Sequence, residues 1–222
     1  MKKNSDSRAK IVAAYVEYWK EHEKSPRSVH HFCKLLKLPE RDFYRQFASL
    51  DAVESHFWRQ FVSDIVARLK KGGEWAGFSA EEKVLAFLFA FFERALDERG
   101  FVALRFGGLS PLCQPLWLAG FREEHESFIR CVISEAVQSK QFASRGSWET
   151  LYPKAFHLHL RGLIDFNLKD NSAEYEKTDV LIEKSVRLAF DLLRSATLES
   201  AIDLGKWLLQ SGINPFPRGS RR

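Results

Sequence analysis

Residues 28–53 of the 222-residue chain read SVHHFCKLLKLPERDFYRQFASLDAV, a pattern that predicts two short helices joined by a tight turn. Ser28 is a favourable N-cap for the first helix, because its side chain can accept a hydrogen bond from a free backbone N–H. Pro39 suits the first turn of the second helix, which we expect to end near Phe47. Phe43 and Phe47 are four residues apart and therefore share the inward face of that helix. The segment predicts a helix-turn-helix.

A helix-turn-helix binds DNA through the exposed face of its second helix, which lies in the major groove. That face would carry Arg41, Arg45 and Gln46, which can bind base edges, with arginine favouring guanine and glutamine favouring adenine. We expect Ser28 and His30, at the start of the first helix, and Tyr44 to contact backbone phosphates. The predicted DNA-binding residues are Ser28, His30, Arg41, Tyr44, Arg45 and Gln46.

The distribution of charge also favours a nucleic-acid-binding N-terminus. Residues 1–70 contain 14 Lys and Arg against 9 Asp and Glu, whereas residues 71–222 contain 20 of each, so the net charge of +5 lies in the first third. Clustered positive charge is typical of a DNA-binding head, and a solubilising basic tail explains it equally well. Glu40 and Asp42 oppose DNA binding, because they repel phosphate unless they accept a hydrogen bond from a cytosine amine.

The element Phe-Tyr-Arg-Gln-Phe at residues 43–47, followed by the start of a long helix, resembles the TetR family of regulators. The resemblance covers residues 8–70 by motif and the remainder by the number and length of the helices. It implies a dimer with a small N-terminal helix-turn-helix module and a larger helical domain that encloses an apolar effector pocket.

The chain departs from the TetR pattern at three positions near the turn. Lys37 replaces the usual glycine, Pro39 replaces a serine, and Leu50 replaces a lysine that contacts phosphate. A non-glycine residue at positive φ costs about 1 kcal/mol, so we expect an altered rather than a broken turn. The leucine at position 50 predicts weaker DNA binding than in a typical relative.

The whole chain shows helical periodicity, which predicts an all-α fold. We expect a three-helix module joined by a long fourth helix to a C-terminal helical dimerisation and ligand-binding domain. Ser79 and Glu82 have the spacing of a capping box at a helix start. The expected domains are residues 1–70, DNA-binding-like; 71–212, ligand-binding and dimerising; and 213–222, a disordered tail. The expected helices span about residues 8–23, 29–36, 39–47, 50–70, 79–99, 115–140, 148–169, 178–195 and 197–210.

An apolar pocket is expected in the second domain. Residues 84–92 are apolar on every side of their helix, so other helices, a partner subunit or a ligand must cover them. TetR-like proteins hold a small apolar or amphipathic effector in a gap between such helices, although a well-packed aromatic core explains any single phenylalanine equally well. Arg161 could meet an acidic group on such a ligand. The predicted lining residues are Phe87, Phe91, Trp117, Phe121, Phe128 and Phe156.

A homodimer is expected through the helices at residues 148–169 and 178–195, two from each subunit, which would form a four-helix bundle across a twofold axis. The second of these helices carries a stripe at three- and four-residue steps, in which small residues permit close approach. The predicted interface residues are Leu181, Ser185, Leu188, Ala189 and Leu192.

Other kinds of site are not indicated. The three cysteines are scattered, without the spacing of a disulfide framework or a zinc site. His157 and His159 point to different faces, so we expect surface or partner-contacting histidines rather than metal ligands, and His125 lies in a charged run that predicts a solvated helix face. We expect neither an enzyme nor a cofactor, because no nucleophile triad, phosphate loop or carboxylate pair is present. The absence of a signal peptide and of a membrane-length apolar run predicts a cytoplasmic protein.

Two functions fit these features. The first is a ligand-responsive transcriptional repressor, a dimer that binds palindromic operator DNA and releases it when a small apolar or amphipathic effector binds. The alternative is a TetR-fold lipid- or isoprenoid-binding accessory protein that has lost DNA binding, which Glu40, Asp42 and Leu50 favour. The N-terminal charge and the element at residues 43–47 favour the first.

Overall fold

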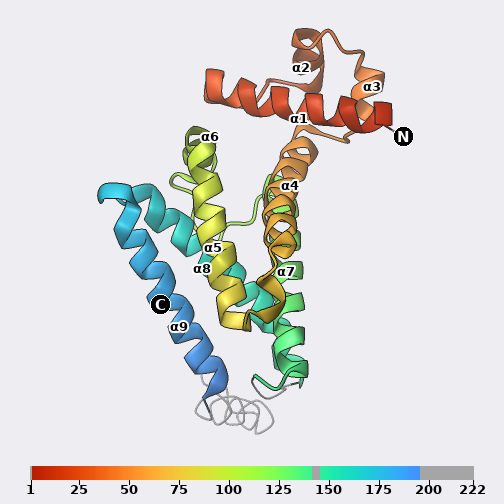
Figure 1. Cartoon of the computed structure of the whole chain (residues 1–222). Coiled ribbons are helices and arrows are strands. Elements are labelled where there is room, and N and C mark those ends of the chain that lie inside the picture. Colours follow the sequence, from red (N-terminus) through yellow and green to blue (C-terminus); the bar gives the residue numbers. More distant parts are fainter. Residues whose placement is uncertain (1, 142–145, 196–222) are drawn as a thin grey trace, which may run out of the picture.

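The computed structural model describes residues 2–141 and 146–195, over which the chain is all-α, as predicted (Figure 1). The helix expected at residues 197–210 and the tail expected at 213–222 lie outside the described residues. The α-helices are α1 (Lys2–His22), α2 (Val29–Leu35), α3 (Glu40–Tyr44), α4 (Leu50–Lys71), α5 (Ala80–Asp97), α6 (Arg99–Phe106), α7 (Ala119–Gln138), α8 (Tyr152–Lys169) and α9 (Glu176–Arg194). The 3-10 helices are η1 (Trp75–Gly77), η2 (Leu116–Leu118), η3 (Gly146–Leu151) and η4 (Ala173–Tyr175).

Helices α1 to α3 form a small module at one end of the molecule, and α4 runs from this module into the larger body (Figure 1). The core of the module is aromatic. The rings of Tyr15 and Phe32 meet edge to face with centroids 5.9 Å apart, and Phe32 meets Phe43 in the same way at 6.4 Å. Phe43 and Phe47 are both buried, as their spacing predicted, so α2 and α3 form the expected helix-turn-helix.

The turn between α2 and α3 forms with a non-glycine residue at positive φ. Lys37 has a φ of 50°, in the left-handed region where the family pattern has glycine. Ser28 is the N-cap of α2, and its Oγ accepts a hydrogen bond from the backbone N–H of His31 at 3.1 Å. Pro39 stands one position before the first residue of α3 rather than inside the helix.

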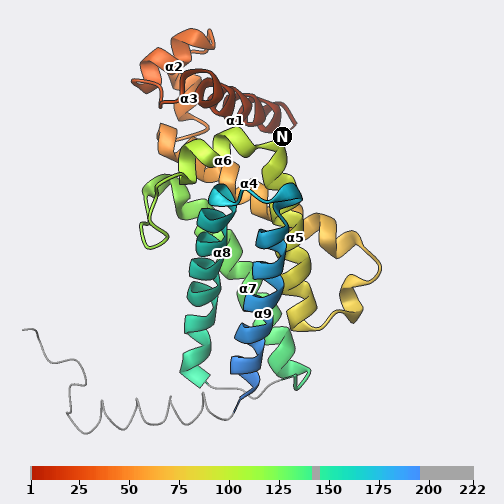
Figure 2. The ribbon, with the colours of Figure 1, turned by 90° about the vertical axis from the view of Figure 1, so that its left-hand side faces the viewer.

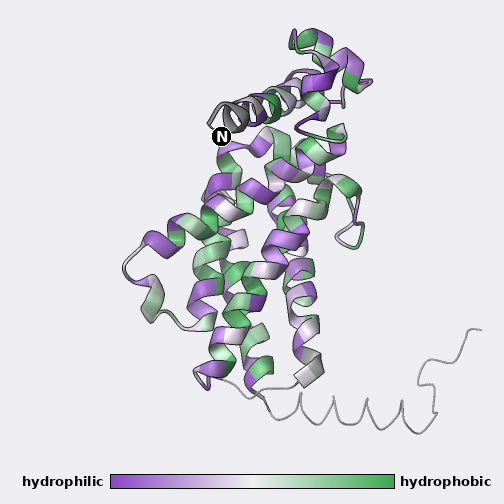
Figure 3. Ribbon diagram, turned by 90° about the vertical axis from the view of Figure 1, so that its right-hand side faces the viewer, coloured by the Kyte–Doolittle hydropathy of each residue, from purple (hydrophilic) through white to green (hydrophobic). Residues whose placement is uncertain are grey.

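The body consists of α4 to α9, and α8 and α9 lie side by side on one flank (Figure 2). Helix α5 begins with the predicted capping box, in which Ser79 Oγ accepts from the Glu82 N–H and Glu82 Oε2 accepts from the Ser79 N–H at 2.7 Å. Hydrophobic and hydrophilic residues are interspersed along the helices of the body (Figure 3). None of the described helices has the length and apolar character needed to cross a bilayer.

Helix α6 was not predicted from the sequence. A single helix was expected over residues 79–99, but α5 ends at Asp97, because Glu98 leaves the helical region at φ −111° and ψ 22°. The chain then enters α6, which is held to the body by the buried side chains of Phe101, Val102 and Phe106. The helices expected from residues 115 and 148 both begin as 3-10 turns, η2 and η3, before α7 and α8 start.

Helices α4 and α7 approach each other closely at Gly120. A Cβ atom there would lie 2.1 Å from the carbonyl oxygen of Ser55, far closer than van der Waals contact. The Gly120 N–H also donates a hydrogen bond to Ser55 Oγ at 2.8 Å. Because α4 carries the helix-turn-helix, this contact sets the position of the module relative to α7.

Candidate DNA-binding surface and ligand-binding interior

Helix α3 presents a basic and aromatic face to solvent. Arg41, Tyr44 and Arg45 are exposed, while Phe43 between them is buried in the module core. The three exposed residues therefore form the outer surface of the second helix. Gln46 lies beyond the end of α3, is half-buried, and lines a crevice beneath α1. The expected DNA-binding residues therefore do not all share one surface, and Gln46 stands apart from the two arginines.

Acidic side chains accompany two of the expected DNA contacts. Arg45 Nη1 lies 3.0 Å from Asp42 Oδ1, and His30 Nδ1 lies 2.5 Å from Glu40 Oε1. Arg41 has no ion-pair partner among the described residues. These exposed pairs are weak, so a phosphate or a base edge can compete for Arg45.

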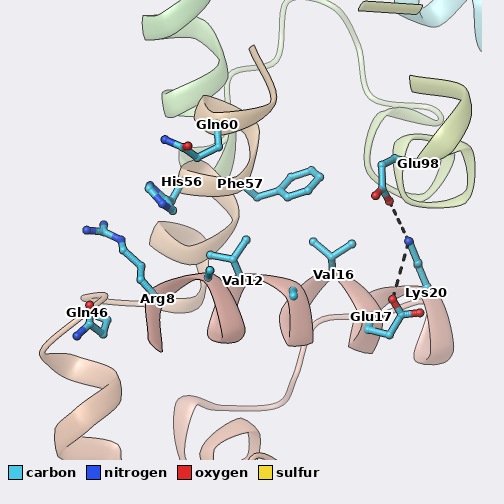
Figure 4. A pocket seen from close by; sticks show the side chains of 12 residues that line it. Arg8, Val12, Val16, Glu17, Lys20, Gln46, His56, Phe57, Gln60 and Glu98 are labelled. Carbon is cyan, nitrogen blue, oxygen red and sulfur yellow. Dashed lines mark ion pairs between the residues drawn. The ribbon is translucent and has the colours of Figure 1, made fainter. Parts of the chain in front are cut away.

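A crevice of about 770 Å³ lies between α1 and α4, and the sequence analysis did not predict it (Figure 4). Val12 and Val16 of α1 and Phe57 of α4 line its apolar part. At one end the Lys20 Nζ lies 2.9 Å from Glu98 Oε2, which links α1 to the corner between α5 and α6. The signal for this crevice was present in the sequence, because Val12 and Val16 form a second apolar face beside the one that fills the module core.

The six side chains predicted to line an effector pocket are all buried. Most of them belong to one aromatic cluster: the centroids of Phe87 and Phe128 are 4.7 Å apart and those of Phe91 and Phe121 are 5.8 Å apart. Phe156 packs elsewhere, on Phe190 of α9 at 5.7 Å. The rings are in direct contact, so a ligand among them would have to move them apart, and the pocket stays a prediction.

The histidines of the body correct an expectation, because two of them are not at the surface. His125 is 1% exposed and His157 is 3% exposed, with ring centroids 5.7 Å apart. His125 Nδ1 and both ring nitrogens of His157 have no hydrogen-bond partner among the described residues. The helical register explains this burial: His125 follows Phe121 by four residues and precedes Phe128 by three, so all three share the buried face of α7.

Burial makes both imidazoles neutral at ordinary pH. It lowers the pKa of His157 to about 4, and the positive charges of Arg161 and Arg122 add to this effect. It lowers the pKa of His125 well below its usual value, with a further contribution from His157. His159 is half-buried and hydrogen-bonds to Ser185 Oγ at 2.7 Å, which joins α8 to α9. The described residues contain no group of three or more side chains placed to hold a metal ion.

A buried ion pair between α4 and α6 is linked to the module by Tyr15 of α1. Glu54 of α4 is fully buried, and its Oε1 accepts a hydrogen bond from Arg105 Nε of α6 at 2.6 Å. Tyr15 of α1 donates its hydroxyl to the other oxygen at 3.0 Å. Burial raises the pKa of the Glu54 carboxyl, while Arg105 opposes the rise. The Arg105 guanidinium also lies over the rings of Trp19 and Trp117, at 4.1 and 4.2 Å from their centroids.

Exposed apolar side chains lie along α9. Leu188 is 60% exposed and Leu192 is 50% exposed, while Leu181, Ser185 and Ala189 are half-buried against the body. On α8, Leu158 and Phe166 are exposed and lie four residues on either side of Gly162, so the three residues share one face of the helix. A Cβ atom at Gly162 would meet nothing within 4 Å, so another helix could approach α8 closely there.

Comparison with known proteins gives a family match. A family model described as the C-terminal domain of tetracycline repressor-like proteins matches residues 83–208, more than half of the chain. No curated protein sequence matches.

Solved structures share the fold. The fatty acid degradation regulator FadR from Bacillus halodurans superposes with a TM-score of 0.54 at 15% identity, covering 85% of this chain and 95% of that one. The transcriptional regulator FadR from Bacillus subtilis, solved with stearoyl-CoA, superposes with a TM-score of 0.52 at 15% identity, covering 83% of this chain and 96% of that one.

Proposed function

The chain belongs to the TetR family, and from this premise we propose that it is a transcriptional regulator that binds DNA through α2 and α3 and responds to a small ligand. The observation that carries the proposal is the outer face of α3, where Arg41, Tyr44 and Arg45 are exposed beside the capped start of α2. Arginine side chains on such a face can donate two hydrogen bonds to guanine.

The regulator acts as a homodimer. The exposed leucines of α9 and the open surface at Gly162 of α8 support a bundle of four helices, two from each subunit. A twofold axis places two recognition helices in successive major grooves, so the operator is palindromic. Effector binding in the body changes the separation of these helices and lowers the affinity for the operator.

The effector is amphipathic. The aromatic interior of the body supplies an apolar surface for it, and a structural neighbour was solved with stearoyl-CoA, an amphipathic thioester. The buried Glu54–Arg105 pair supports a route from the body to the module, because it ties α6 to α4 and to Tyr15 of α1. A ligand that displaces α6 would therefore disturb both helices that hold the helix-turn-helix.

The alternative, a lipid-binding accessory protein without DNA binding, is favoured by the acidic partners of α3. Glu40 and Asp42 pair with His30 and Arg45, and Leu50 is packed against the core where the family pattern has a phosphate-contacting lysine. A selection experiment separates the two functions, because the accessory protein would retain no genomic fragment even at low salt.

The test is selection of genomic fragments by the purified protein at low salt, with Arg41→Ala beside it. If Arg41 contacts a base with both terminal nitrogens, its loss costs about 1–3 kcal/mol and relaxes the preference at one base pair. Arg130→Ala is the matched control, since Arg130 is exposed on α7 in the body. An empty selection with the unmodified protein would favour the accessory function.

Leu50→Lys is a gain-of-function test at the start of α4. The aliphatic stem of lysine can cover the half-buried surface that Leu50 occupies, while its ammonium reaches solvent. We expect tighter binding to every sequence and a salt dependence steeper by about one phosphate contact. An unchanged salt slope would place position 50 away from the DNA backbone.

A further inference from the structure

Arg161 of α8 is a charged side chain in the interior of the body. It is 2% exposed, and its two terminal nitrogens donate to the carbonyl oxygens of Cys113 and Ser110, each at 3.1 Å. Among the described residues no carboxylate pairs with it. Burying a positive charge is costly unless an anion offsets it, and two neutral carbonyls leave the charge itself uncompensated.

The titratable neighbours of Arg161 include the Cys113 thiol and the His157 imidazole, and no carboxylate among the described residues forms an ion pair with it. His157 lies one helical turn before Arg161, on the same face of α8, and its ring nitrogens have no partner. Arg122 follows Phe121 in α7, and the Phe121 ring meets the His157 ring edge to face; the positive charges of Arg122 and Arg161 both lower the pKa of His157. Arg122 also has no partner among the described residues. The cluster therefore lacks a negative charge.

Aromatic rings border this cluster. The centroid of Phe121 is 5.4 Å from that of His157, and the centroid of Phe87 is 5.3 Å from that of His125. The Phe106 ring centroid lies 5.3 Å from the Arg161 guanidinium carbon. A polar end thus adjoins an apolar surface, which is the arrangement that an amphipathic ligand requires.

We propose that Arg161, with Arg122 and His157, receives an oxyanion of the effector, a carboxylate or a phosphate, whose apolar part lies among the rings of α5 and α7. The inference rests on the proposed effector-binding function and names the chemical class of the ligand. A metal ion does not fit the cluster, because two guanidinium groups repel a cation and no carboxylate is present. A neutral apolar ligand would leave the buried charge uncompensated and the imidazoles unpaired.

The test compares three probes with the same twelve-carbon alkyl chain: tridecanoate, dodecyl phosphate and 1-dodecanol. Their binding to the full-length protein is measured by calorimetry. We expect at least one anion to bind about tenfold or more tightly than the alcohol, because hydrogen bonds to charged groups contribute about 1.5–3 kcal/mol. The two anions differ only in the head group, so the comparison also identifies which oxyanion the cluster prefers.

Variants locate the site. Arg161→Gln and Arg122→Gln should reduce the preference for the anion to about threefold or less, with alcohol affinity changed by no more than about twofold. Arg122 is half-buried and donates to no backbone carbonyl among the described residues, so its substitution should disturb the fold less. Arg122→Gln therefore tests the proposal even if Arg161→Gln does not fold. Arg8→Gln is the matched control, because Arg8 lines the crevice between α1 and α4 instead.

Three outcomes would overturn the proposal: equal affinity for anion and alcohol, no binding of any probe, or an unchanged preference in both variants of the cluster. A loss of preference in Arg8→Gln alone would place the anion in the crevice and would also overturn it. Release of operator DNA is measured separately. Selective anion binding without DNA release would contradict the proposed function while leaving this inference intact.

Discussion

Lys37 holds a backbone conformation that its side chain disfavours, with a φ of 50° in the turn between α2 and α3. Replacing it by glycine removes the contact between Cβ and the backbone, although glycine also gains freedom in the unfolded chain. We predict that Lys37→Gly raises the free energy of unfolding by up to about 1 kcal/mol. Urea denaturation measures the change, and Lys37→Ala, which keeps the Cβ, should be close to neutral. A lower midpoint for the glycine variant would contradict this account.

His157 should make the protein sensitive to mild acid. Its pKa is about 4 when folded, because it is buried near two arginines, against about 6.5 when the chain is unfolded. Between these values the unfolded state binds a proton that the folded state does not, so stability is full above pH 6.5 and falls as the pH drops towards 4. The loss from this group is at most about 3 kcal/mol, and His125 adds to it in the same direction.

The measurement is urea denaturation at pH 7 and pH 5. The unmodified protein should lose more stability between these values than His157→Gln, which cannot titrate. His22→Gln is the control for the removal of an imidazole, because His22 is exposed and lies in α1 rather than in the interior of the body. Equal losses in the unmodified protein and His157→Gln would show that this imidazole is not buried in the neutral form.

At the scale of the helices, the close contact between α4 and α7 requires a glycine at position 120. The Cβ introduced by Gly120→Ala would lie 2.1 Å from the Ser55 carbonyl oxygen, so the two helices would have to separate. We predict a loss of about 1–3 kcal/mol of stability. Gly100→Ala in α6 is the matched control, because a Cβ there meets nothing within 4 Å and alanine favours helix by up to about 1 kcal/mol. Equal stability of the two variants would contradict the close packing.

Substitutions of Glu54 and Arg105 should have strongly non-additive effects on the free energy of unfolding. Arg105→Met leaves a buried carboxylate without its cation, which costs about 3–5 kcal/mol. Adding Glu54→Gln removes the charge, so the double variant should recover much of that loss. Thermal or urea unfolding of both variants checks this, and a double variant less stable than Arg105→Met would refute it. The same comparison tests whether the pair holds α6 against α4.

At the scale of the whole molecule, the apolar surface of α8 and α9 predicts a dimer. Leu188→Asp or Leu192→Asp places a charge in the proposed interface and should yield monomers or insoluble protein. Leu35→Asp is the matched control, because Leu35 is 53% exposed on α2, in the N-terminal module rather than on α8 or α9. Light scattering measures the mass, and a stable dimer carrying both α9 substitutions would contradict the assignment.

Local signals were sufficient to predict several elements of the N-terminal module and the start of α5 in the body. Ser28 caps α2, the spacing of Phe43 and Phe47 places both in the core, and Ser79 with Glu82 begins α5, because each signal depends on residues within four positions. The same reasoning predicted the all-α fold and the strained turn at Lys37. These features follow from the sequence alone, since a capping hydrogen bond forms within one helix end and the helical period determines which residues share a face.

The interior of the body depended on contacts between distant segments. Glu54 and Arg105 are 51 residues apart, and Arg161 binds carbonyl groups 48 and 51 residues before it, so their burial follows from how the helices pack. His125 stands in a charged run that suggested a solvated face, yet its register with Phe121 and Phe128 turns it inward. The helical period shows which residues of a helix share a face, but not which other helices cover that face. The tertiary packing of the helices decides this, and with it which charged groups are buried without a partner.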